Sequence, residues 1–180
     1  IDTKDSEKPV LSLVFALSKG DRNDLVCQKA TELGVPSIVF WQSERSIIRI
    51  EPGPSKEHKL ERWRKISESA ARQSAQTFIP EIYLVAGIED LLAVMHRITG
   101  PGQKAIYCSL SENARPLHNV VVDNSRLHLI IGPEGDLSPA EEGAFSKAGF
   151  VPATLGPSVL RSETAAIAAI AMAQALWRAL

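Results

Sequence analysis

The sequence contains few cysteines and almost no excess charge of either sign. Cys27 and Cys108 are its two cysteines among 180 residues, and the formal net charge is −1. Two thiols without a paired spacing to histidine favour ordinary core side chains over a disulfide or a zinc site, so we expect no bound metal. Because the net charge provides no general attraction to polyanions, any binding of nucleic acid must come from local clusters of lysine and arginine.

No apolar run approaches the roughly twenty residues that a bilayer crossing requires. The most apolar stretch, 165–173, lies in a segment that is interrupted by Gln174 and Arg178. Residues 1–8 are polar where a signal peptide would need an apolar core. These absences predict a cytoplasmic protein, and 44% apolar with 23% charged residues is ordinary for one globular domain of this length.

Three common functional motifs are also absent. The sequence has no G-x-G-x-x-G after a predicted strand, no G-x-x-x-x-G-K-[ST] and no G-x-S-x-G. These absences argue against a phosphate-binding loop and against a serine nucleophile elbow. The histidines show no spacing to a catalytic partner and are predicted to be surface or structural residues: His58, His96, His118 and His128.

The chain instead shows a regular alternation of strand and helix patterns. We predict strands at 10–17, 37–41, 82–85, 104–110, 127–131 and 151–155, and helices at 22–33, 56–74, 88–98, 139–148 and 163–177. A turn is predicted at 100–102, and a polar connection precedes the strand at 127–131. This alternation is typical of an α/β fold with a mostly parallel sheet.

Helix boundaries are marked by capping residues. Asp21 is expected to cap the first helix, and Gly34 to end it. Ser138, Pro139 and Glu141 form an unusually complete helix start, with a capping hydroxyl, a proline at the first position and a glutamate three residues on. The last helix is apolar on nearly every side, so a well-buried core helix and a dimer contact both fit its sequence.

Two glycine-containing turns follow predicted strands about twenty residues apart. The first, 131–135, reads Ile-Gly-Pro-Glu-Gly, and the second, 155–165, reads Leu-Gly-Pro-Ser-Val-Leu-Arg-Ser-Glu-Thr-Ala. Ligands of open α/β sheets bind beyond the carboxyl ends of strands. Gly132 and Gly135 lack a Cβ, so they can adopt backbone angles closed to other residues and can let a ligand approach the main chain closely. The two turns predict a ligand site without a phosphate cradle.

Both turns, together with the segments 19–22, 28–34 and 43–46, resemble motifs of the RsmE-type family in the same order. The resemblance extends over 10–180. Members of this family methylate N3 of a uridine in small-subunit (16S) ribosomal RNA with S-adenosylmethionine. The resemblance implies a SPOUT-type α/β knot, with a C-terminal trefoil knot at which the donor binds, and a homodimer formed through the C-terminal helix and knot region.

The resemblance also implies roles for individual residues. Arg161 and Glu163 are the implied catalytic residues, since a carboxylate can accept the N3 proton and a guanidinium can stabilise charge on the uracil oxygens. Two alternatives to these catalytic roles remain open. Glu163 can simply be a favourable charge at a helix N-terminus, and Arg161 can form a salt bridge or contact a phosphate. The implied donor-binding residues are Ser109, Leu110, Ile131, Gly132, Pro133, Glu134, Gly135, Leu155, Gly156, Val159, Leu160, Ser162 and Thr164. The implied RNA-binding residues, for which a solvated charged face is the alternative, are Lys19, Arg22, Arg45 and Arg49.

Five differences from the family pattern stand out. The family usually has Gly at the position of Asp136, and commonly Arg and Thr at those of Ser158 and Ser162. It often shows Glu-Gln-Ser-Gly-Arg where this chain has Arg-Gln-Ser-Ala-Gln, at 72–76. Its members usually begin with a PUA-like β-barrel that is absent from this chain, which points to a truncated protein. We therefore expect a linker or disordered segment at 1–9, a methyltransferase domain at 10–180, and weak recognition of ribosomal RNA by this chain alone.

Two other functions remain open from the sequence. A related knotted enzyme would methylate a ribose 2′-oxygen, and a non-catalytic RNA-binding or assembly module would keep the fold without the reaction.

Overall fold

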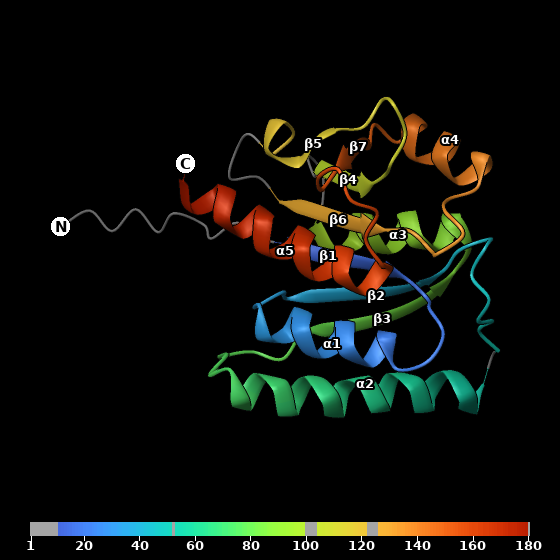
Figure 1. The fold of residues 1–180 in the computed structure, drawn as a ribbon. Coiled ribbons are helices and arrows are strands. Elements are labelled where there is room, and N and C mark those ends of the chain that lie inside the picture. Colours follow the sequence, from blue (N-terminus) through green and yellow to red (C-terminus); the bar gives the residue numbers. More distant parts are fainter. Residues whose placement is uncertain (1–10, 52, 100–103, 122–125, 180) are drawn as a thin grey trace.

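The computed structural model describes residues 11–51, 53–99, 104–121 and 126–179, which form one sheet covered by helices (Figure 1). The linker expected at 1–9 and the turn at 100–102 lie outside the described residues. The strands are β1 (Leu11–Ala16), β2 (Ser37–Gln42), β3 (Glu81–Ala86), β4 (Lys104–Cys108), β5 (Arg115–Pro116), β6 (Leu127–Ile131) and β7 (Val151–Thr154). The helices are α1 (Arg22–Glu32), α2 (Pro54–Gln73), α3 (Gly87–Thr99), α4 (Pro139–Lys147) and α5 (Ser162–Ala179), with a short 3₁₀ helix η1 (Leu117–Asn119).

The sheet has seven strands in the order β3-β2-β1-β6-β4-β7-β5, and all neighbours pair in parallel. After β3 the chain crosses to the other side of β1 to form β4, and β6 later fills the space between them. The order of the strands therefore reverses next to β1. The carboxyl ends of β6, β4 and β7 lie side by side at this switch point, which is where open α/β sheets bind ligands.

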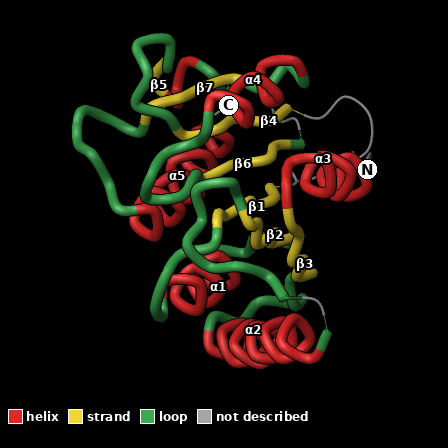
Figure 2. Tube along the Cα trace, turned by 90° about the vertical axis from the view of Figure 1, so that its right-hand side faces the viewer, coloured by secondary structure: helices red, strands yellow, loops and turns green. Residues whose placement is uncertain are grey.

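Helices cover both faces of the sheet, as expected where parallel strands are apolar along their whole length (Figure 2). On one face Trp63 of α2 stacks on Phe40 of β2 with ring centroids 3.9 Å apart, and α1 and α5 complete this layer. On the other face Phe145 of α4 packs against Trp41 and Tyr107, beside α3. The predicted α/β class with a mostly parallel sheet is confirmed.

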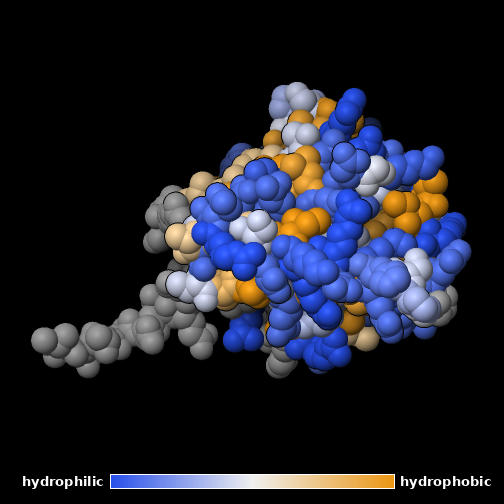
Figure 3. Space-filling view, turned by 90° about the horizontal axis from the view of Figure 1, so that it is seen from below, coloured by the Kyte–Doolittle hydropathy of each residue, from blue (hydrophilic) through white to orange (hydrophobic). Residues whose placement is uncertain are grey.

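The outward face of α2 is polar. Seen from that side, the molecule is mostly hydrophilic with scattered apolar side chains (Figure 3). Among the residues described, no helix is both long enough and apolar enough to span a membrane.

Most predicted helix ends are confirmed. Gly34 ends α1 at a φ of +73°, and both hydrogen bonds of the capping box link Ser138 with Glu141 at the start of α4. The prediction that Asp21 caps α1 is wrong. Asp21 has a nearly helical ψ of 4°, whereas a capping side chain needs an extended backbone. Asn23 instead holds the start of α1 to the preceding loop. Its side chain accepts a hydrogen bond from Ser18 N (3.1 Å) and donates one to Ser18 O (2.6 Å).

The polar connection before β6 contains β5 and η1 in its described part, and the sequence reasoning predicted neither of them. Leu117 of η1 is fully buried against the core that includes α5. A strand of two residues carries no periodicity, so the sequence offered no local signal for it. The predicted trefoil knot stays a prediction.

Candidate functional site

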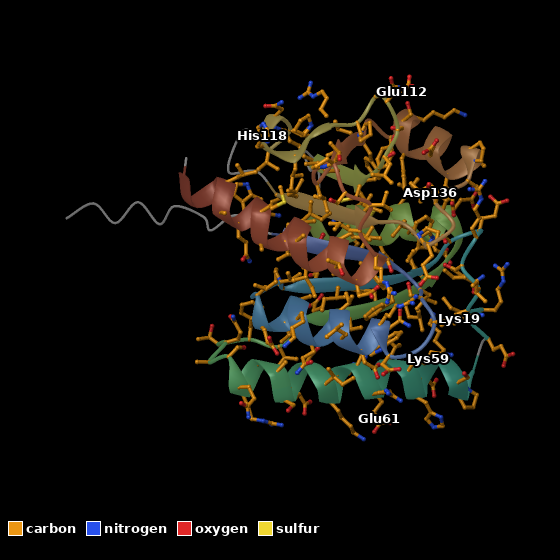
Figure 4. All side chains as sticks on the ribbon, viewed as in Figure 1. Lys19, Lys59, Glu61, Glu112, His118 and Asp136 are labelled. Atoms are coloured by element: carbon orange, nitrogen blue, oxygen red, sulfur yellow. The ribbon has the colours of Figure 1, made fainter. Side chains whose placement is uncertain are left out.

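A cavity of about 340 Å³ lies at the switch point of the sheet. Its walls come from the ends of β4, β6 and β7, the two glycine turns and the first residues of α5. Figure 4 shows Asp136 and Glu112 at the same end of the sheet, beyond the ends of the strands, with Lys19 below them. The lining residues are Cys108, Ser109, Leu110, Ile131, Gly132, Pro133, Glu134, Asp136, Ala153, Thr154, Leu155, Ser158, Val159, Leu160, Arg161, Ser162 and Ala165.

The structure brings most of the expected site residues together. Arg161 lines the cavity with the expected donor-binding residues of both turns, whereas Glu163 lies outside the lining. Gly135, Gly156 and Thr164 also lie outside it. Lining residues that the sequence reasoning missed are Cys108, Asp136, Ala153, Thr154, Ser158 and Ala165. Several of these missed residues are sequence neighbours of expected residues. The ends of the predicted strands before both turns could therefore have pointed to them.

The first turn does not use the conformational freedom of its glycines. Neither Gly132 nor Gly135 is among the residues with a positive φ. Asp136 adopts the left-handed conformation instead, with a φ of 60°. This explains why a glycine suits this position in the family, since a residue without a Cβ adopts that conformation freely. In the second turn, Gly156 has a φ of +137°.

Arg22 connects the two turns from the start of α1. Its guanidinium forms an ion pair with Glu134 of the first turn, and its Nε lies 3.6 Å from Oε2 of Glu163 at the start of α5. The Glu163 side chain is 13% exposed, so this pair is largely shielded from water. Ser162 Oγ donates to Glu163 Oε2 at 3.4 Å and lies 3.2 Å from Ser18 Oγ in the β1–α1 loop. The β1–α1 loop and the first residue of α1 thereby contact both the first turn and the start of α5.

The β2–α2 loop holds the first turn from another direction. Arg45 Nη1 donates to the carbonyl oxygen of Gly135 at 2.9 Å. Glu44 N donates to Oε1 of Glu141, the capping-box residue of α4, at 2.7 Å. Arg49 donates to the carbonyl oxygen of Glu44 at 3.4 Å, whereas Lys19 is exposed. Two of the four expected RNA-binding residues, Arg22 and Arg45, therefore contact the first turn.

The thiol in the cavity wall is not an activated nucleophile. Burial raises the pKa of Cys108 to about 12, so the side chain stays a neutral thiol at physiological pH. The wall at this position is therefore apolar in character.

A second hollow of about 860 Å³ lies between α1 and α2 and includes neither glycine turn. Arg22 borders both this hollow and the network that joins the turns. The other residues around it are Lys19, Gly20, Asp21, Asp24, Leu25, Gln28, Ile66, Ser69, Ala70 and Gln73.

A cavity of this size at the switch point of a parallel sheet is the arrangement in which α/β domains bind small molecules. Residues 6–174 match the family described as RNA methyltransferase domain, and the chain belongs to that family.

Similar proteins agree with this assignment. Ribosomal RNA small subunit methyltransferase E of Mycobacterium bovis is 32% identical over 163 residues, which cover 91% of this chain and 62% of that protein. The solved structure of Ribosomal RNA small subunit methyltransferase E from Neisseria gonorrhoeae bound to S-adenosyl methionine is 32% identical, with a TM-score of 0.81 over 98% of this chain and 70% of that chain. The expected resemblance to the RsmE-type family is confirmed.

The fold extends to more distant proteins. The A. aeolicus TrmH/SpoU tRNA modifying enzyme has a TM-score of 0.60 over 94% of this chain and 76% of that chain, at 13% identity, which shows a shared fold alone. This chain spans 62% of the length of the Mycobacterium bovis relative.

Proposed function

We propose that this chain is the catalytic domain of an S-adenosylmethionine-dependent methyltransferase that modifies N3 of a uridine in small-subunit (16S) ribosomal RNA. The observation that carries the proposal is that both glycine turns border one cavity at the switch point of the sheet. The name of the Mycobacterium bovis relative and the ligand of the Neisseria gonorrhoeae structure support the choice of reaction.

The lining suits this donor. Its volume of about 340 Å³ falls within the range of roughly 300–1,000 Å³ for small-molecule sites. Apolar side chains such as Leu110, Ile131 and Leu160 can hold the uncharged adenine. Glu134 and Asp136 outnumber Arg161 among the charged lining residues, which favours a cationic sulfonium over a phosphate. When bound, the donor supplies an electrophilic methyl group.

The chain's own residues provide the acid–base chemistry. N3 of uracil carries a proton at neutral pH, and the nitrogen becomes a good nucleophile only when that proton leaves. Glu163, next to lining residue Ser162, is the proposed proton acceptor, and its contact with Arg22 orients the carboxylate. Arg161, in the lining, stabilises the charge that develops on the uracil oxygens. Alignment of the two reactants by the cavity contributes up to ~7–11 kcal/mol to the acceleration.

The partners proposed for this chain are small-subunit ribosomal RNA and a second copy of itself, in the cytoplasm. Lys19 is exposed beside the site, and Arg49 lies on the neighbouring β2–α2 loop; both can contact phosphates. A self-contact would use α5, where Ala171 and Ala175 are exposed and Ile167 is partly exposed along one stripe.

The experiment measures donor binding and methyl transfer with the same chain. Calorimetry with S-adenosylmethionine should show one binding site, and tritiated donor should label small-subunit particles that lack the modification. Digestion of the labelled RNA should yield 3-methyluridine. Glu163→Gln should lower the rate of transfer about 100-fold or more, since a general base contributes about 10²–10⁴-fold.

Glu61→Gln is the matched control because it makes the same substitution on α2, where Figure 4 shows the side chain pointing away from the sheet. It should leave transfer unchanged. A 2′-O-methylated nucleoside as product would favour the knotted ribose methyltransferase instead. Absence of any heat of donor binding would refute the proposal and favour a non-catalytic RNA-binding or assembly module.

A further inference from the structure

Arg22 and Arg45 both belong to segments where the sequence suggested contacts with RNA. In the structure both point their guanidinium groups at the first glycine turn. Arg22 pairs with the side chain of Glu134, and Arg45 donates to the backbone of Gly135 at 2.9 Å. Arg22 begins α1 and Arg45 belongs to the β2–α2 loop, so two separate segments hold the turn.

Arg22 has a second partner at the start of α5. Its Nε is 3.6 Å from Glu163 at the start of α5, and its side chain is only 31% exposed. The first turn and the start of α5 both contribute to the cavity wall, through Glu134 and Ser162. One guanidinium therefore links the two parts of the wall.

We infer that Arg22, assisted by Arg45, is a positioning residue of the donor site that fixes the spacing of its two walls. This inference rests on the proposed function, because it assumes that the cavity binds the methyl donor. Arg22 acts through Glu134 and Glu163 and needs no contact with an RNA phosphate.

The chemistry of the three side chains explains why an arginine occupies this position. Glu134 and Glu163 contact the same cation, so their like charges lie close together and would repel each other without it. A guanidinium presents five donors in a rigid plane and can bind two carboxylates at once. A lysine keeps the charge as a single point on a flexible stem, so it can only partly replace this function.

The test is donor affinity in the absence of RNA, measured by calorimetry with S-adenosylmethionine. Arg22→Gln should weaken donor binding about three- to tenfold, as expected for the loss of two partly shielded ion pairs. Arg22→Lys should bind with intermediate affinity. In transfer assays the KM for the donor should rise, and kcat should also fall because Arg22 contacts the proposed proton acceptor Glu163.

Lys29→Gln is the matched control. Lys29 is on the same helix, is paired with Glu32 at 2.8 Å and has a similar exposure of 37%, but it is remote from both turns. Its substitution should leave donor affinity unchanged. A second test combines Arg22→Gln with Glu134→Gln: the loss caused by Arg22→Gln should shrink when Glu134 no longer carries a charge.

Thermal unfolding shows whether each variant folds, and if Arg22→Gln does not, Arg45→Gln tests the same turn and should weaken donor binding about twofold. Undiminished donor affinity in Arg22→Gln, with weaker RNA binding, would overturn the inference and leave the proposed function standing. Failure of the unmodified chain to bind donor would instead overturn the proposed function itself.

Discussion

His128 is a fully buried ionisable side chain in the middle of the sheet. It lies on β6 opposite Ser12 of β1, and the two side chains are hydrogen-bonded to each other. Burial lowers the pKa of His128 to about 4, and a hydrogen bond with the backbone of Met95 opposes this shift. The ring is therefore neutral in the folded protein at physiological pH, as the sequence predicted for a structural histidine.

This histidine makes stability depend on pH. Between its unfolded pKa of 6.5 and its folded pKa of about 4, the unfolded chain binds a proton that the folded chain does not. The contribution of neutral His128 is thus complete above pH 6.5 and is lost as the pH falls toward 4, at a cost on the order of 3 kcal/mol. Urea unfolding between pH 7.5 and 5 should show this decline in the free energy of unfolding.

His128→Gln should flatten that pH dependence, because glutamine does not titrate. His58→Gln changes an exposed histidine of α2 and should leave the pH dependence of the free energy of unfolding the same as in the unmodified chain. Equal slopes for His128→Gln and the unmodified chain would show that His128 does not carry the effect.

At the scale of elements, the end of α2 shows how a local backbone requirement limits the choice of residue. Ser74 N donates to Ala70 O and Gln76 N to Ala71 O, each at 3.0 Å, which closes the helix. Ala75 between them has a φ of 55°, the left-handed conformation that glycine adopts most easily at a helix end. The family often has glycine at this place, and the structure supplies the reason.

Ala75→Gly should therefore stabilise the protein. The left-handed conformation costs a residue with a Cβ roughly 1–2 kcal/mol, and the added freedom of an unfolded glycine costs about 0.5–1 kcal/mol. The difference predicts a gain of about 0.5–1 kcal/mol, visible as a rise in the midpoint of thermal unfolding.

The same substitution at Ala93, an exposed residue inside α3, should have the opposite sign. Ala93→Gly should cost about 1 kcal/mol because glycine is a poor helix former. If both variants are destabilised, the explanation from backbone conformation is wrong.

The end of α1 depends on side chains from two other parts of the chain. Gln76 Nε2 donates to Glu32 O at 3.0 Å, and Gln174 Nε2 of α5 donates to Leu33 O. These bonds satisfy carbonyl groups that a helix end leaves without partners. The family often has Arg at the position of Gln76. In this chain the side chain at that position instead hydrogen-bonds to the end of α1.

At the scale of the whole molecule, α5 is buried on one side only. Ala166, Ala169 and Ala173 are fully buried, whereas Ala171 and Ala175 are exposed on the same helix. Because the sequence of this helix is apolar on nearly every side, it predicts that nearly the whole circumference is packed against other residues. The rest of the chain covers one side, and the proposed second copy would cover the other.

Ala171→Glu should convert the proposed dimer to a monomer, since it places a charge within the small apolar contact. Sedimentation velocity should show the lower mass, while far-UV circular dichroism remains unchanged. Ala93→Glu, on the exposed face of α3, is the matched control and should keep the mass of the unmodified chain. A monomer for the unmodified chain at every concentration tested would refute the dimer.

By itself, the sequence determined the elements, most helix ends and the two turns. Periodicity, caps such as Ser138 with Glu141, and a strand such as Leu127–Ile131 depend on neighbours within a few residues. The error at Asp21, and the omission of β5 and η1 in the described part of the polar connection, occurred where local signals were weak or ambiguous.

The tertiary structure alone decided the order of the strands, the meeting of both turns at one cavity and the partners of Arg22. These depend on contacts between segments far apart in the chain, and no local pattern encodes which strand fills the space beside β1. A side chain with several possible partners, such as Arg22 between RNA and two glutamates, takes the ones that the folded chain brings within reach.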